Sequence, residues 1–244
     1  MNMVQNVTDE LRIYKCYRIN AQFLVCLDDI FRKYNENYQI TVIAICGKVT
    51  LKFSSINEFL NSETSLTSKI DKLKIKAEFP IPNTYTYDEV VVNFTDEANI
   101  SLLDDKITFD FSDPNGYLII KNQIETLLKN YSLSYSFFSR TKLVSLLSLL
   151  FLLTITVYTD IRDIIFPTVV QKVILYGSIT GIILPMLPFI SKYKRFLFPR
   201  HEFEFGVNKI SIEKAKNQRN FWGISLIVAF IVGILVNFIS SFLF

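Results

Sequence analysis

An uncharged stretch of 24 residues, 221–244, constrains this chain more than any other feature. Sixteen of its residues are Leu, Ile, Val or Phe. A helix of that length, rising about 1.5 Å per residue, reaches roughly 36 Å and exceeds the ~30 Å hydrocarbon core of a bilayer. The stretch therefore predicts a membrane-spanning helix.

Two earlier stretches, 143–158 and 173–191, are also apolar and uncharged, and each predicts a further span. The segment 192–220, between the second and third spans, carries eight Lys and Arg residues, whereas 159–172 carries two. Positive charge next to spans favours the cytoplasmic side. The expected protein is a multi-pass protein of the inner (plasma) membrane, with its N-terminus in the cytoplasm and its C-terminus outside.

Residues 1–139 have an ordinary, mildly acidic composition, with 14 Lys and Arg against 18 Asp and Glu. Apolar residues at helical spacing predict a helix over 8–34, and the pair Asp113-Pro114 predicts the start of another. A capping-box spacing at Ser55 to Glu58 predicts a short third helix. Alternating or β-branched runs predict six strands, at 38–45, 48–53, 72–79, 89–94, 99–103 and 106–111.

The expected fold class is thus an α+β cytosolic domain of about six strands and three helices, followed by three transmembrane helices. The domain boundary falls at 139, so that 140–244 forms a membrane domain with the basic segment 192–220 on its cytoplasmic side.

No pattern in the sequence predicts catalysis. Phosphate-binding loops, nucleophile elbows and zinc-protease motifs are absent from the sequence. One histidine, His201, serves the whole chain, and three cysteines lack metal-ligand spacing. We therefore expect no enzyme activity, no cofactor and no metal. A lone His201 is better interpreted as structural than as a pH switch.

Small and polar residues mark the predicted spans. Gly177 and Gly181 have the GxxxG spacing that lets helices approach closely in lipid, within one chain or between subunits. Gly233 and Asn237 lie in the third predicted span. A polar Asn237 in lipid needs a polar partner, either on another helix of the same chain or in an oligomeric pore.

Cations at Lys192, Lys194, Arg195 and Arg200 are interleaved with aromatic residues. Basic residues close to a membrane bind anionic lipid headgroups. The alternative is that these cations only set the membrane topology.

This order of parts resembles the small prokaryotic anti-phage (abortive infection) membrane effectors. The resemblance implies a homo-oligomer that permeabilises or depolarises the inner membrane when a cytosolic protein or second messenger triggers its cytosolic domain. A second hypothesis is a membrane-anchored binding module that recruits a cytosolic partner without forming a pore. A third is a membrane enzyme using Asp160, Arg162 and Asp163. None of the three involves direct binding of nucleic acid.

Overall fold

The structure is a computed structural model that describes residues 6–63, 66–82, 84–96, 105–136, 139 and 192–243. The chain divides into two compact units, one formed by Met1–Ser134 with Arg200–Phe244 and the other by Tyr135–Pro199. The first unit joins the start of the chain to residues far along the sequence. The predicted boundary at 139 remains a prediction.

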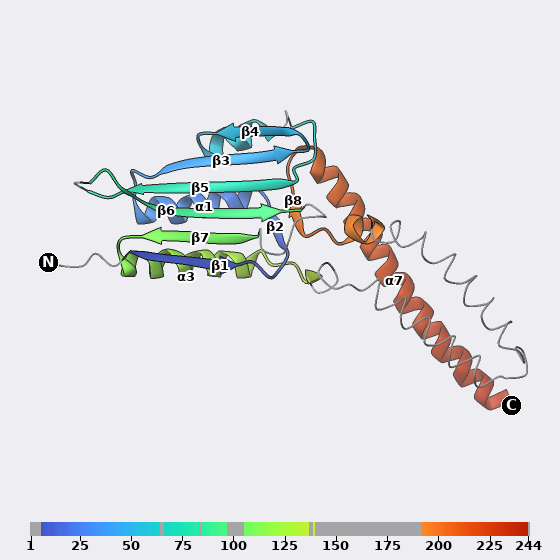
Figure 1. The fold of residues 1–244 in the computed structure, drawn as a ribbon. Coiled ribbons are helices and arrows are strands. Elements are labelled where there is room, and N and C mark those ends of the chain that lie inside the picture. Colours follow the sequence, from blue (N-terminus) through green and yellow to red (C-terminus); the bar gives the residue numbers. More distant parts are fainter. Residues whose placement is uncertain are drawn as a thin grey trace, which may run out of the picture. The chain divides into compact units, whose positions relative to one another are not determined.

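A six-stranded antiparallel sheet dominates the first unit (Figure 1). Its spatial order is β1-β7-β6-β5-β3-β4. The strands are β1 (Val7–Arg12), β3 (Gln39–Cys46), β4 (Val49–Phe53), β5 (Lys72–Pro80), β6 (Tyr87–Thr95) and β7 (Lys106–Phe111). Every neighbouring pair in this sheet is antiparallel.

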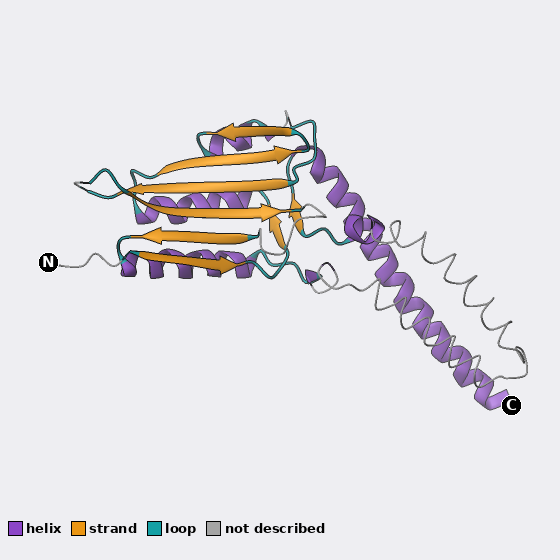
Figure 2. Ribbon diagram, viewed as in Figure 1, coloured by secondary structure: helices purple, strands orange, loops and turns teal. Residues whose placement is uncertain are grey.

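Helices cover one face of this sheet (Figure 2). They are α1 (Ala21–Tyr34), α3 (Pro114–Asn130) and the short α2 (Ile56–Asn61). The strands turn their buried side chains to the helices; β5, for example, buries Leu73, Ile75 and Phe79. No element of the described residues lies on the opposite face, which we call the open face (Figure 1).

The predicted helix over 8–34 is wrong in its first half. Residues 7–12 form β1, and β2 (Tyr17–Ile19) follows before α1 begins at Ala21. Asn20 caps α1 by accepting a hydrogen bond from the backbone N–H of Phe23, at 2.9 Å. Thr8 has the residue type of a helix cap, but pairing along the whole length of β7 outweighs that local preference.

The α+β architecture is present, with a main sheet of six strands and a second sheet of two, but the six strands of the main sheet are not all the predicted ones. The predicted strand 99–103 lies outside the described residues, and β1 supplies the sixth strand. Two predicted helix starts are confirmed, since Ser55 caps α2 and Asp113 caps α3 with Pro114 in its first turn. Local capping chemistry therefore predicted these starts correctly.

The C-terminal part of the first unit contributes two elements. Strand β8 (His201–Phe203) pairs in parallel with β2. Helix α7 (Gly206–Leu243) follows, with Gly206 at a φ of 49°. Residues 200–208 are thereby joined to the start of the chain.

The prediction of three transmembrane helices is contradicted. No helix in the described ranges is both long and apolar enough to cross a membrane. The spans predicted at 143–158 and 173–191 lie outside the described residues. Residues 221–243 are not a separate helix but continue α7, whose first half is polar and carries the ion-paired Arg219. The expectations of a pore and of an inner-membrane, multi-pass location, with the N-terminus in the cytoplasm and the C-terminus outside, depended on those spans and are corrected with them.

Candidate functional site: a buried polar cluster at the end of the sheet

A buried carboxylate and the single histidine form the centre of the cluster. The Nε2 atom of His201 lies 3.0 Å from Oδ2 of Asp105, and both side chains are fully buried. The other carboxylate oxygen of Asp105 accepts the backbone N–H of Thr95 at 2.8 Å. The dyad thus joins β8 to the ends of β6 and β7.

The hydrogen bonds of His201 define its tautomer. Its Nδ1 accepts the backbone N–H of Tyr17 at 3.2 Å, so this nitrogen carries no proton. The proton then lies on Nε2, which donates to Asp105. The ring stacks on that of Tyr17 and meets Phe94 edge-on. Both ring nitrogens are occupied, which leaves neither available to a substrate.

Arg200 brings a positive charge to the same carboxylate. Its Nε lies 2.5 Å from Oδ2 of Asp105, and its side chain is mostly buried. Its Nε and Nη2 atoms make no hydrogen bond with the residues that the structure describes. The ion pair alone therefore offsets the desolvation of this guanidinium.

Asp96 holds the same segment from β6. Its Oδ1 accepts the backbone N–H of Arg200 at 2.9 Å, and its Oδ2 lies 2.5 Å from Nζ of Lys69. Its side chain is 1% exposed, so both contacts are needed to satisfy a buried charge.

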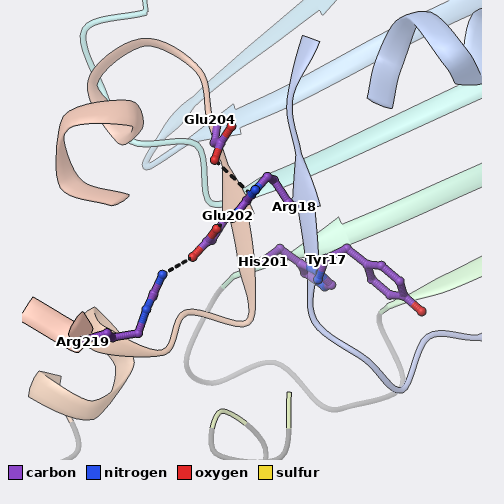
Figure 3. A network of polar contacts seen from close by, with 6 residues as sticks. All are labelled: Tyr17, Arg18, His201, Glu202, Glu204 and Arg219. Atoms are coloured by element: carbon purple, nitrogen blue, oxygen red, sulfur yellow. Dashed lines mark hydrogen bonds and ion pairs between the residues drawn. The ribbon is translucent and has the colours of Figure 1, made fainter. Parts of the chain in front are cut away.

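Glu202 links the cluster to α7 (Figure 3). It is buried and forms ion pairs with Arg18 of β2 at 3.4 Å and with Arg219 of α7 at 2.8 Å. Arg18 also contacts the more exposed Glu204, at 3.1 Å. The Glu202 carboxylate therefore links β2, β8 and Arg219 of α7 in one network of ion pairs.

Asn208, in the first turn of α7, forms hydrogen bonds with Ile70, two residues before β5. Its side-chain amide accepts from the backbone N–H of Ile70 at 3.1 Å and donates to the carbonyl of Ile70 at 3.3 Å. Asn208 is itself 3% exposed. This two-way contact reproduces the pairing of a strand residue.

These contacts meet at one end of the sheet. Ile70 precedes β5, Asp96 follows β6 and Asp105 precedes β7, and each of them contacts the segment 200–208. We call this set of contacts the clamp. The clamp includes charges of both signs, and both side chains of its Asp105–His201 dyad are fully buried.

The residues predicted to be functional are not brought together here. Gly177 and Gly181 lie outside the described residues, and Gly233 and Asn237 lie in α7. The helical residues 192–197 include the predicted lipid-binding cations Lys192, Lys194 and Arg195. Arg200, the fourth of those cations, instead pairs with Asp105 inside the clamp.

Sequence reasoning missed the acidic half of the clamp. Asp96 and Asp105 adjoin predicted turns, where exposed acids are common. Residues 201–205 alternate ring-bearing and acidic side chains, a pattern typical of extended backbone, and 201–203 form β8. That alternation did not reveal that both faces of β8 are buried, because the partner strand β2 had been predicted as helix.

Comparison with known proteins identified no relative of this chain. No protein-family model matches the chain, and no curated protein or solved structure resembles it significantly. Within the described part of the chain, no cluster of His, Cys, Asp or Glu has the composition of a metal site. Any functional conclusion therefore rests on the geometry.

Proposed function

We propose that this chain is a non-enzymatic binding module. Its α+β domain takes up a partner on the open face of the sheet, and the clamp couples that domain to α7. Recruitment of a partner was one of the two main functions expected from the sequence. Membrane anchoring is not part of the proposal.

The observation that carries the proposal is the way three strand ends hold one distant segment. The ends of β5, β6 and β7 hold Asn208, Arg200 and His201 respectively through hydrogen bonds. A shift of any of these strands therefore changes the corresponding hydrogen bond. Buried ion pairs are sensitive to such changes, because separating the partners leaves a desolvated charge. Binding of a partner to the open face would therefore affect α7 through the contacts of the clamp.

The burial of the dyad supports binding over catalysis. A general base must reach the proton that it abstracts, directly or through one water. Both nitrogens of His201 are engaged within the fold, and Asp105 is fully buried. A stable, pre-formed joint of this kind suits a module that passes on a binding event.

The experiment is quantitative co-purification of the tagged full-length chain from its native cells. The proposal expects a partner recovered in fixed proportion to the chain and displaced by excess untagged chain. A chain that yields no saturable partner, but that turns over a substrate when purified, would overturn the proposal.

A further inference from the structure

A row of cations crosses the open face of the sheet. In the strand register, Lys52 lies opposite Ile43, Ile43 opposite Lys74, Lys74 opposite Asn93, Asn93 opposite Lys106, and Lys106 opposite Arg12. The row runs over all six strands, and at about 4.8 Å between strands it is about 24 Å long. We call Lys52, Lys74, Lys106 and Arg12 the cationic row.

Few acids balance this row. Glu10 contacts both Arg12, at 3.4 Å, and Lys106, at 2.8 Å, so one carboxylate is shared by two cations. Lys52 and Lys74 form no ion pair with the described residues. Lys72, two residues before Lys74 on the same face of β5, adds a further positive charge.

Apart from Glu10, the acids on the six strands of the open face gather at its other end, where they already have partners. Lys76 contacts Glu78 at 2.6 Å and Glu89 at 2.8 Å. Asp110 accepts a hydrogen bond from Thr8 at 3.3 Å. The excess positive charge is therefore confined to the end of the face that adjoins the clamp, where Lys106 directly follows Asp105.

A row of positive charges can bind a negatively charged polymer, either a nucleic acid or an acidic polypeptide. The side chains beside the cations distinguish between these two. Single-stranded nucleic acid binds sheet faces by stacking its bases on aromatic rings. The six strands offer one ring on this face, Tyr87, which lies at the acidic end. Beside the cations lie the aliphatic side chains of Ile43 and Ile45, which suit the apolar side chains of a polypeptide.

An unpaired strand edge adjoins the row at Lys52. Strand β4 ends at Phe53 opposite Val42, whereas β3 extends back to Gln39. A groove of about 810 Å³ lies beside this edge. It is lined by strand residues that include Gln39, Thr41 and Lys52, and by Arg32 of α1 and Glu58 of α2 on the helix-covered side of the sheet. Free strand edges hydrogen-bond extended polypeptide.

We infer that the cationic row is the docking surface for an acidic, partly aliphatic segment of a partner protein. The segment would place its carboxylates on Lys52, Lys74 and Lys106 and its apolar residues on Ile43 and Ile45. This inference rests on the proposed function and specifies the chemical character of the partner's binding segment. It also puts the partner one residue away from the clamp carboxylate Asp105.

The test is binding of a synthetic peptide in which glutamates alternate with leucines, measured by fluorescence anisotropy with the full-length chain. A thymidine oligonucleotide of equal charge is the competing probe. The test variant is Lys52→Gln with Lys74→Gln. The matched control is Lys33→Gln with Lys129→Gln, which removes the same charge from exposed positions on α1 and α3.

A lysine at the surface contributes up to about a fivefold effect, so the loss of the exposed Lys52 and the half-buried Lys74 is expected to weaken binding of the peptide about tenfold. The control should bind as the wild type does, and added salt should narrow the difference. Equal affinity of both variants would overturn the inference. So would an oligonucleotide that binds more tightly than the peptide and loses affinity in the test variant only.

Failure here can be told apart from failure of the proposed function. A partner that still co-purifies with the Lys52→Gln, Lys74→Gln variant contradicts this docking surface and leaves the binding module standing. A wild-type chain that recovers no partner contradicts the binding module itself.

Discussion

The Oδ2 atom of Asp105 lies 3.0 Å from Nε2 of His201, although 96 positions separate the two residues in the chain. Neither side chain is exposed. The same carboxylate also meets the guanidinium of Arg200. Asp105 is thus hydrogen-bonded to His201 and ion-paired with Arg200 at the joint between the sheet and the C-terminal segment, which offsets part of the cost of burying these groups.

Replacing Asp105 with Asn should destabilise the fold strongly. The variant leaves the buried Arg200 without a counter-charge, and breaking a buried ion pair costs about 3–5 kcal/mol. Urea denaturation of the full chain measures the change. The control is Asp110→Asn, which alters an exposed carboxylate on the same strand and should change stability by less than about 1 kcal/mol. Similar midpoints for both variants would contradict the role given to Asp105.

Replacing Glu202 with Gln should loosen the start of α7. Glu202 loses its charge-assisted contacts to Arg18 and Arg219, each worth about 1.5–3 kcal/mol. Amide hydrogen exchange over 206–219 should then accelerate by roughly one to two orders of magnitude. The matched variant is Glu204→Gln, which affects the half-exposed contact to Arg18 only. If both variants exchange at the wild-type rate, Glu202 does not hold α7.

Acid should weaken the contact between β1 and α3. Hydrogen bonds from Lys121 and Tyr117 lower the pKa of Asp9 from its ordinary 3.8 to about 2. A lowered pKa means that Asp9 contributes stability above pH 3.8, and that this contribution is lost as the pH falls from 3.8 to about 2.

The measurement is the pH dependence of unfolding free energy in wild type and in Lys121→Gln. The variant should lose less stability across that window, because its Asp9 titrates closer to the ordinary pKa. Lys129→Gln removes an equal charge from α3 without touching Asp9 and should follow the wild type. Parallel curves for all three proteins would show that Lys121 does not set the pKa of Asp9.

Substituting Ala at Gly206 should cost more than the same change at Gly47. Both glycines have positive φ, 49° and 62°, where Ala costs about 1–2 kcal/mol. A Cβ at Gly206 would also lie 2.8 Å from the backbone oxygen of Leu66, whereas nothing lies near Gly47. Overpacking of this kind adds about 1–3 kcal/mol. Thermal denaturation measures the loss of stability in each variant. Equal losses would contradict the close packing of Gly206 against Leu66.

Local signals predicted much of the α+β domain. The alternation of β5 and the caps at Ser55 and Asp113 specify structure within a few residues, and each of them matches the fold. The register that aligns Lys52 with Arg12 depends on the pairing of strands far apart in the chain. No local pattern carries that information.

The N-terminal strand and the clamp could not be predicted from local patterns either, because both depend on contacts between residues far apart in the chain. Residues 7–12 have the spacing of an amphipathic helix. They form a strand because their backbone pairs with the edge of β7 along its whole length. His201 was interpreted as structural, which agrees with its burial, but its partner Asp105 could not be identified from a sequence with 18 acids before residue 140. The hydropathy of 221–244 predicts a separate span, whereas these residues continue α7, which begins at Gly206.

The most direct test of the account is amide hydrogen exchange of the full chain with and without a saturating amount of the glutamate–leucine peptide. The N–H of Arg200 bonds to Asp96 and that of Tyr17 bonds to His201, so both report on the clamp. If the open face is coupled to α7, peptide should change exchange at Tyr17, at Arg200 and over 206–219. Peptide that binds at the cationic row but leaves exchange at all of these positions unchanged would contradict the coupling.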